Sequence, residues 1–194
     1  MNLEGKRKTR ESILCAASNL FKCQGYNGTG LNQIIEVSGA PKGSIYYHFP
    51  GGKEEIAVEA VKHVGNEIKT MIKKELASSE DAAAAFRYHA EKIASYFDVP
   101  LSHENSGLHI GLIASETALT SEPIRQACQE TYKEWQSLYK EKLLLSGFSE
   151  KRSKELALLV SSMIEGAVIL SNTYGNGKPL RNIAEHFTYV IRVQ

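Results

Sequence analysis

The sequence predicts an all-α protein in which three short helices precede a bundle of six more. Along nearly all of the 194 residues, apolar side chains recur at intervals of three and four, the spacing of one helix face. No segment shows the strict alternation of apolar and polar residues that a half-buried strand requires. Clusters of glycine, proline and serine interrupt the periodicity and divide it into nine helices.

The first three helices occupy the first quarter of the chain. Thr29 could cap the second helix, and the Ser38-Gly39-Ala40-Pro41 turn ends it. Pro50-Gly51-Gly52 ends the third. We expect a first helix with its buried stripe from Ile13 to Phe21 and its end at Gly25, a second from Leu31 to Ser38, and a third from about Lys42 to Phe49.

Six further helices are expected beyond Lys53. The Ser78–Asp81 segment and Ser149 carry N-capping residues, and Pro123 suits the first turn of a helix. Val99 to Ser106 is expected to be a loop. We predict two domains, residues 1–53 and 54–194, with breaks in the second at 78–81, 99–106, 121–123, 147–149 and 175–177.

Composition excludes several classes of protein. Hydrophobic residues make up 42% of the chain, which is enough to bury a core. No run approaches the ~18 consecutive apolar residues of a membrane span, and the charged segment from Glu4 to Arg10 lacks the apolar stretch of a secretion signal. We therefore expect a cytoplasmic protein with no membrane partner.

The three cysteines fit a reducing compartment. Cys15 and Cys23 would lie two turns apart on one helix, about 12 Å and beyond disulfide reach. Cys128 falls in an apolar stripe, where a free cysteine is more often a small core residue than a reactive thiol. We predict that Cys128 is buried, with a thiol sensor as the alternative.

Charge is distributed unevenly along the chain, although the net charge is only +1. Residues 1–53 carry seven Lys and Arg against three Glu, a net charge of +4, and the remainder carries −3. A basic first domain is consistent with contact to phosphates at that end of the molecule.

The segment from Gly25 to Lys53 has the layout of a helix-turn-helix. Such motifs place the amino end of the second helix in the major groove of DNA, where Lys42 and Ser44 would lie. Ile45 and Phe49 share one face, which leaves Tyr46, Tyr47 and His48 spread over the rest of the helix. Burying two tyrosines and a histidine together is costly because each polar group needs a partner.

We therefore predict that these side chains face double-stranded DNA. The alternative is structural: Tyr46 in the core with its hydroxyl bonded locally, His48 on an exposed surface, and Lys42 a solvated turn residue.

The stretch from Thr29 to Ile56 resembles the DNA-binding motif of the TetR family of repressors. That motif runs from Thr through Ala-Gly and a turn to Gly-x-hydrophobic-Tyr-x-His-Phe and a Lys-Glu pair. Ile35, Pro41 and a link one residue longer at Pro50-Gly51-Gly52 depart from it. The resemblance implies that Lys42 and Gly43 approach bases, that Tyr47 contacts a base methyl or sugar, and that Thr29, Tyr46, His48 and Lys53 grip phosphates.

A narrower resemblance is to the LmrA and QdoR (YxaF) group of that family. Gly-Leu-Asn-Gln-Ile and Gly-Ala-Pro-Lys-Gly-Ser in the first domain carry it, as do Gly111–Leu119 and Ser162–Ala167 in the second. It implies a homodimeric repressor that leaves a palindromic operator when a drug-like or flavonoid molecule binds, and that controls efflux or catabolic genes. We expect the last two helices, with Gly166 and Ala167, to form the dimer surface.

The second domain is expected to bind the effector between its helices. For each aromatic or Met residue alone, plain core packing is the alternative. Glu165 lies in an apolar run and must be paired, hydrogen-bonded or exposed, either in a dimer ion pair or against a ligand. The candidate effector residues are Phe97, His109, Ile110, Leu112, Glu116, Tyr132, Trp135, Met163 and Glu165.

Two other functions compete with regulation. An adaptor could carry a helix-turn-helix that does not touch DNA. Ser115, Glu116, His103 and His109 could belong to a small hydrolase or a metal site, but the sequence has no nucleophile elbow, no His-Glu-x-x-His and no paired carboxylates at helical spacing. We therefore expect no enzyme, no cofactor and no metal.

Overall fold

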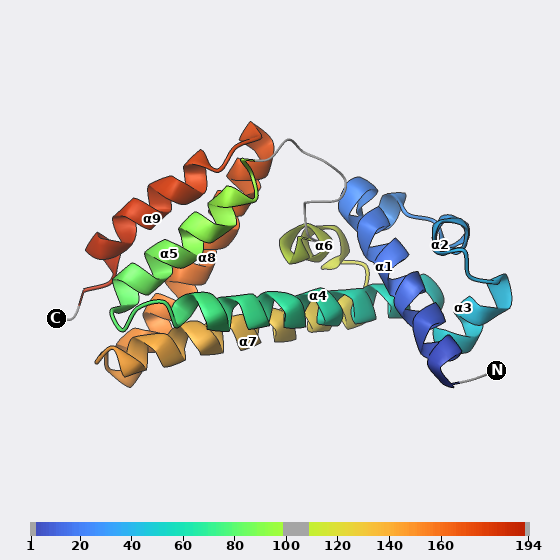
Figure 1. Ribbon diagram of the computed structural model, residues 1–194, viewed down its shortest axis with the longest axis horizontal. Coiled ribbons are helices and arrows are strands. Elements are labelled where there is room, and N and C mark those ends of the chain that lie inside the picture. Colours follow the sequence, from blue (N-terminus) through green and yellow to red (C-terminus); the bar gives the residue numbers. More distant parts are fainter. Residues whose placement is uncertain (1–2, 99–108, 193–194) are drawn as a thin grey trace. The chain divides into compact units, whose positions relative to one another are not determined.

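The computed structural model describes residues 3–98 and 109–192, so the loop expected over Val99–Ser106 lies outside the described residues. Within them the chain is all-α, as predicted, with nine helices and no strand (Figure 1). These are α1 (Leu3–Gly28), α2 (Leu31–Ser38), α3 (Lys42–His48), α4 (Gly52–Leu76), α5 (Ala82–Ser95), α6 (Ile110–Thr117), α7 (Glu122–Leu145), α8 (Glu150–Tyr174) and α9 (Lys178–Val190).

The helices pack as two units. The first holds α1, α2, α3 and α6, with α4 up to Asn66 and α7 up to Thr131. The second holds the remainders of α4 and α7 with α5, α8 and α9. The α4 helix runs without a break past residue 53. The division into domains at residues 1–53 and 54–194 stays a prediction.

The core of the first unit is made by α1, α2 and α3, and α1 contacts both of the others. Ile13 and Phe21 of α1, Ile34 of α2, and Ile45 at the middle of α3 are at most 3% exposed, as is Phe49 just after α3. Each such side chain contributes about 1.5 to 3 kcal/mol by leaving water. This burial fixes which side of α3 faces inward.

The connection between α1 and α2 differs from its prediction. Helical backbone is interrupted at Gly25 (φ 75°, ψ 171°), and α1 resumes as far as Gly28. Gly30, not Thr29, is the N-cap of α2, so the prediction that Thr29 caps this helix is wrong. The turn after α2 is confirmed, since Gly39 ends the helix in the left-handed conformation at φ 64°.

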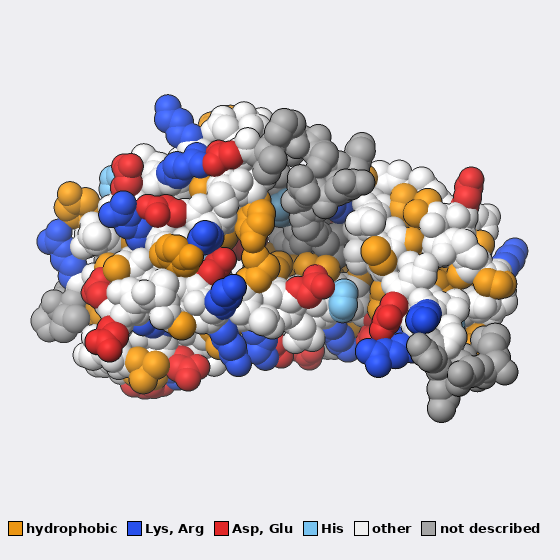
Figure 2. All heavy atoms as spheres, viewed as in Figure 1, with side chains coloured by type: hydrophobic (Ala, Val, Ile, Leu, Met, Phe, Trp, Pro, Cys, Tyr) orange, Lys and Arg blue, Asp and Glu red, His pale blue; other side chains and the backbone are white. Residues whose placement is uncertain are grey.

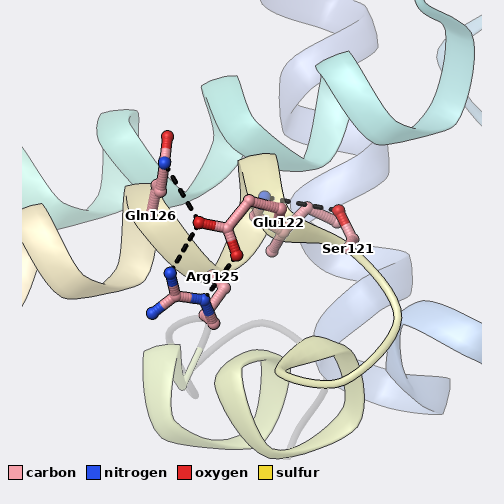
Figure 3. A network of polar contacts seen from close by, with 5 residues as sticks. Ser121, Glu122, Arg125 and Gln126 are labelled. Atoms are coloured by element: carbon pink, nitrogen blue, oxygen red, sulfur yellow. Dashed lines mark hydrogen bonds and ion pairs between the residues drawn. The ribbon is translucent and has the colours of Figure 1, made fainter.

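The start of α7 is held by the polar groups in Figure 3. Ser121 Oγ accepts the Ile124 N–H at 3.3 Å. In a contact not drawn in Figure 3, the same hydroxyl donates to Glu54 Oε1 of α4 at 2.7 Å. In the first turn, Glu122 pairs with Arg125, whose hydrogen bonds lower the pKa of Glu122. A carboxylate is favoured there because the amino end of a helix is partially positive.

In the second unit, α9 packs against α5 and α8 (Figure 1). Ala94, Phe97, Ala167 and Leu180 form one buried cluster of this core. A Cβ at Gly177, before α9, would lie 2.4 Å from the carbonyl oxygen of Ala94, so only glycine allows this approach. The expected caps are confirmed: Asp81 accepts the Ala84 N–H, and Ser149 accepts the Arg152 N–H.

A buried polar network, absent from the predictions, joins three helices of the second unit. His89 of α5 contacts Glu75 Oε2 of α4 through Nδ1 at 2.6 Å and the hydroxyl of Tyr139 of α7 through Nε2 at 2.9 Å. Glu75, His89 and Tyr139 are 8%, 3% and 3% exposed. Burial raises the pKa of Tyr139, so the hydroxyl stays protonated.

We expect Tyr139→Phe to lower the free energy of unfolding by about 1 to 3 kcal/mol, because it leaves a buried ring nitrogen of His89 without its partner. Urea denaturation measures this loss. Tyr46→Phe is the control, since its ring is 51% exposed and its loss should be close to zero. Equal stabilities of the two variants would contradict the role of the network.

Candidate nucleic-acid interface

The outward face of α3 carries most of the residues predicted to bind DNA. Tyr46 and Tyr47 are 51% and 61% exposed, and Lys42 and Gly43 are exposed at the amino end. Ser44 is half-buried. The alternative that placed Tyr46 in the core is therefore wrong.

The amino end of α3 is open to an approaching partner. No atom lies within 4 Å of the point where a Cβ of Gly43 would be. Within the described chain no ion pair engages Lys42, whereas Arg10 is paired with Glu59 at 2.6 Å. A free cation next to accessible backbone can reach base edges or phosphates.

His48 is neither fully exposed nor fully buried. Its ring meets the edge of Tyr47 at 5.0 Å between centroids and lies beside Phe49. Nε2 is inaccessible and has no hydrogen-bond partner among the described residues. The alternative of a plain surface histidine does not fit this position.

Thr29 and Lys53, both expected to grip phosphates, direct their polar groups inward. Thr29 is 1% exposed, and its hydroxyl donates to the Gly25 carbonyl at 2.7 Å. Lys53 Nζ donates to the carbonyl oxygens of Tyr26 and Thr29 and lies 4.2 Å from the centroid of the Tyr26 ring. In this conformation the Thr29 hydroxyl is buried, and the half-buried Lys53 ammonium group is bonded to the backbone; that the two side chains grip phosphates stays a prediction.

Two family models match the chain. The first, for the bacterial regulatory proteins of the tetR family, matches residues 13–60, which include α2 and α3. The second, for the C-terminal domain of LmrA/YxaF-like transcriptional regulators, matches residues 82–186. The chain belongs to the TetR family.

Relatives and solved structures agree with this assignment. The transcriptional regulator LmrA of Bacillus subtilis is 49% identical over 91% of this chain and 93% of its own length. YxaF of the same organism is 45% identical over 95% of each chain. A TetR regulator from Chloroflexus aurantiacus has a TM-score of 0.81 at 25% identity over 97% and 96% of the two chains. This TetR-family protein is therefore a transcriptional regulator.

Tyr132, Trp135 and Glu165 lie together in the second unit. The Tyr132 hydroxyl donates to Glu165 Oε2 at 2.9 Å, and its ring meets Trp135 edge to face at 5.4 Å. Burial raises the pKa of Glu165, and the Tyr132 hydrogen bond opposes that shift in part. Glu165 thus has a partner within its own chain. Phe97 and Trp135 are 9% and 6% exposed, and Met163 is half-buried.

The other candidate effector residues belong to α6 and its start, in the first unit. Ile110 is buried, Leu112 is 46% exposed, and burial lowers the pKa of His109. Glu116 Oε2 accepts the Asn27 N–H at 2.9 Å, a contact that the sequence did not predict. Glu116 therefore bonds to the α1–α2 connection in this conformation.

A groove of about 620 Å³ runs between α8 and α9. Met163, Gly166 and Leu170 of α8 line it, with Lys178 and Ile183 of α9. Leu158, Ile169 and Tyr174 expose further apolar surface on α8. In Figure 2, the surface over α5 and α9 carries acidic and basic side chains close to one another.

We expect Glu165→Gln to change how stability depends on pH. The pKa of Glu165 is raised on folding, so its contribution is fully present below the ordinary value of 4.5 and is lost as pH rises through the folded value. The variant cannot ionise at this position. Its free energy of unfolding should therefore rise, relative to that of the native protein, when the pH is raised from acidic to neutral. Urea denaturation of both proteins at about pH 4 and at about pH 7 measures the change.

The control is Glu141→Gln, an exposed carboxylate on α7. If the native protein and Glu165→Gln differ in free energy of unfolding by the same amount at acidic and neutral pH, the raised pKa of Glu165 is contradicted.

Proposed function

We propose that this TetR-family regulator is a repressor that binds a palindromic operator as a homodimer and leaves it when a small aromatic effector binds. The observation that carries the proposal is α3. Its seven residues bury Ile45 and expose Tyr46, Tyr47 and Lys42. Exposed aromatic side chains mark an interaction site, and a short helix that also exposes a cation at its amino end suits the major groove of DNA.

The contacts on DNA follow from position on α3. Lys42, Gly43 and Ser44 lie at the amino end, where the first residues of a recognition helix reach base edges. By the family motif, Tyr47 presents a ring to a thymine methyl or a sugar, and Tyr46 contacts a phosphate. The motif assigns a phosphate to His48 as well, whose Nε2 is inaccessible in the structure. Phosphate contacts position the helix, and base contacts select the sequence.

The effector site is proposed around Tyr132, Trp135 and Glu165. Aromatic rings supply stacking surfaces for a flavonoid- or drug-like molecule, and the half-buried carboxylate of Glu165 with the Tyr132 phenol can orient hydroxyl or amino groups of that molecule. The match to LmrA/YxaF-like C-terminal domains supports a shared class of effector. By the same likeness, we propose efflux or catabolic genes as targets.

The groove between α8 and α9 is the proposed dimer surface. Among the described residues, α8 is long and apolar enough to cross a membrane by length and composition, yet only 44% of its most apolar 18 residues are buried within the chain. We infer that the exposed part packs against a second copy. A cytoplasmic dimer of this kind would place two α3 helices about 34 to 36 Å apart on one face of the duplex.

The proposal is tested by selecting DNA from a random duplex pool with the purified protein and then adding flavonoids. We expect an enriched palindrome and release of the duplex by at least one aromatic ligand. Failure to enrich any sequence above the starting pool would overturn the repressor function.

We expect Lys42→Ala to reduce affinity for the selected operator by about 1 to 3 kcal/mol, because a base contact is lost. The loss should be much smaller on random duplex, where no base is specified. Fluorescence anisotropy on both duplexes measures it. Lys62→Ala is a matched control, since this exposed lysine lies on α4 away from the proposed contacts. Equal losses on the two duplexes would assign Lys42 to phosphate.

We expect Gly166→Lys to dissociate the dimer while leaving the chain folded. No atom lies within 4 Å of a Cβ at Gly166, so the side chain fits one copy but not a close interface. Replacing a helical glycine should stabilise the monomer by about 0.5 to 1 kcal/mol. Sedimentation at several concentrations measures the assembly, and a variant that stays dimeric would exclude this surface.

A further inference from the structure

The bend from Gly25 to Thr29 comprises the kinked last turn of α1 and the residue after it, and it leaves backbone groups outside regular helix bonding. Gly25 has φ 75° and ψ 171°, which no other described residue of α1 approaches. Backbone amides and carbonyls that leave a helix need other partners when they are shielded from water. At this bend, side chains from two distant helices supply several of those partners.

Lys53, at the start of α4, supplies the donors. Its Nζ lies 3.1 Å from the Tyr26 carbonyl oxygen and 3.0 Å from that of Thr29. The same ammonium group lies over the Tyr26 ring at 4.2 Å, where the ring face attracts a cation. Three contacts therefore hold the ammonium group against the bend.

Glu116, near the end of α6, supplies the acceptor. Its Oε2 receives the Asn27 N–H at 2.9 Å, between the two carbonyls that Lys53 binds. A Cβ at Gly25 would lie 2.2 Å from Glu116 Oε1, so this carboxylate occupies the space that any other residue at position 25 would fill. The glycine and the carboxylate fit one another.

The Thr29 hydroxyl completes the arrangement from within the bend. It donates to the Gly25 carbonyl at 2.7 Å, and the Thr29 N–H donates to the Tyr26 carbonyl at 3.2 Å. In this segment, an amide is bonded to the anionic Glu116 and two carbonyls are bonded to the cationic Lys53. Since α2 begins two residues later, at Leu31, the bend sets the direction in which α2 leaves α1.

We propose that Lys53 and Glu116 are positioning residues for DNA binding. They act on the Gly25–Thr29 bend and through it on α2 and α3, and neither touches phosphate or effector. The proposal rests on the proposed function, because it assigns a role to residues of the same DNA-binding unit. It replaces the phosphate contact expected of Lys53 and the effector contact expected of Glu116.

The charges of the two residues make the proposal testable by sign. A phosphate contact through Lys53 would add about one to the slope of log affinity against log salt, whereas a positioning role leaves the slope unchanged. Removing a carboxylate from a DNA-binding surface ordinarily strengthens binding by reducing repulsion. A positioning role for Glu116 requires the opposite, a weaker complex.

The experiment compares Lys53→Met, Glu116→Ala and Glu116→Gln with the native protein. Binding to a random-sequence duplex and to the selected operator is measured over a range of salt, and hydrogen exchange is measured at the amides of residues 25–31. We expect Lys53→Met and Glu116→Ala to bind about tenfold more weakly with an unchanged salt slope, because a hydrogen bond to a charged group is lost in each. Glu116→Gln keeps an acceptor oxygen and should retain near-native affinity.

Exchange at the bend separates failure of this proposal from failure of the proposed function. The Asn27 amide should exchange about tenfold faster in Glu116→Ala, and Lys42→Ala should leave it unchanged. A lower salt slope in Lys53→Met with native exchange would overturn the proposal, as would unchanged or tighter binding by Glu116→Ala. If the native protein binds neither duplex, the proposed function fails, and native exchange at Asn27 in Glu116→Ala would reject the bend contact as well.

Discussion

Helices of seven and eight residues are too short to be stable alone in water, so α2 and α3 depend on the apolar side chains that attach them to α1. Ile34 of α2 and Ile45 of α3, with Phe49 beyond it, are completely buried and provide that attachment. The same burial decides what remains outside. Once Ile45 and Phe49 face inward, Tyr46 and Tyr47 must face solvent or a partner.

The attachment also constrains the backbone around it. The chain must leave α1, turn and enter α2 within a few residues, and the unpaired groups of the Gly25–Thr29 bend take partners from α4 and α6. Lys53 and Glu116 therefore belong to the support of α3, although the sequence places them 24 and 87 residues after Thr29. In the second unit, the Glu75–His89–Tyr139 network has a comparable role, since it bonds α4, α5 and α7 in an otherwise apolar core.

The sequence predicted the helices well because periodicity and caps are local signals. Gly39, Asp81, Ser149 and the exposed tyrosines of α3 all lie where local rules place them. The family motif did not indicate that the side chains of Thr29 and Lys53 bond to backbone carbonyls of the bend. Contacts between distant helices could not be predicted either. Nothing in the sequence around Glu116 indicates that its carboxylate accepts the Asn27 N–H. The groups that such contacts satisfy are backbone atoms, which every residue has.

We propose that the outward face of α3 reads DNA in a two-fold dimer. Hydroxyl-radical footprinting of the complex with its selected duplex tests it most directly, because it maps backbone contacts on both strands without any variant. We expect two symmetry-related protected segments, on one face of the duplex and about 34 to 36 Å apart, one helical turn. A single asymmetric footprint, or protection that does not follow the palindrome, would contradict it.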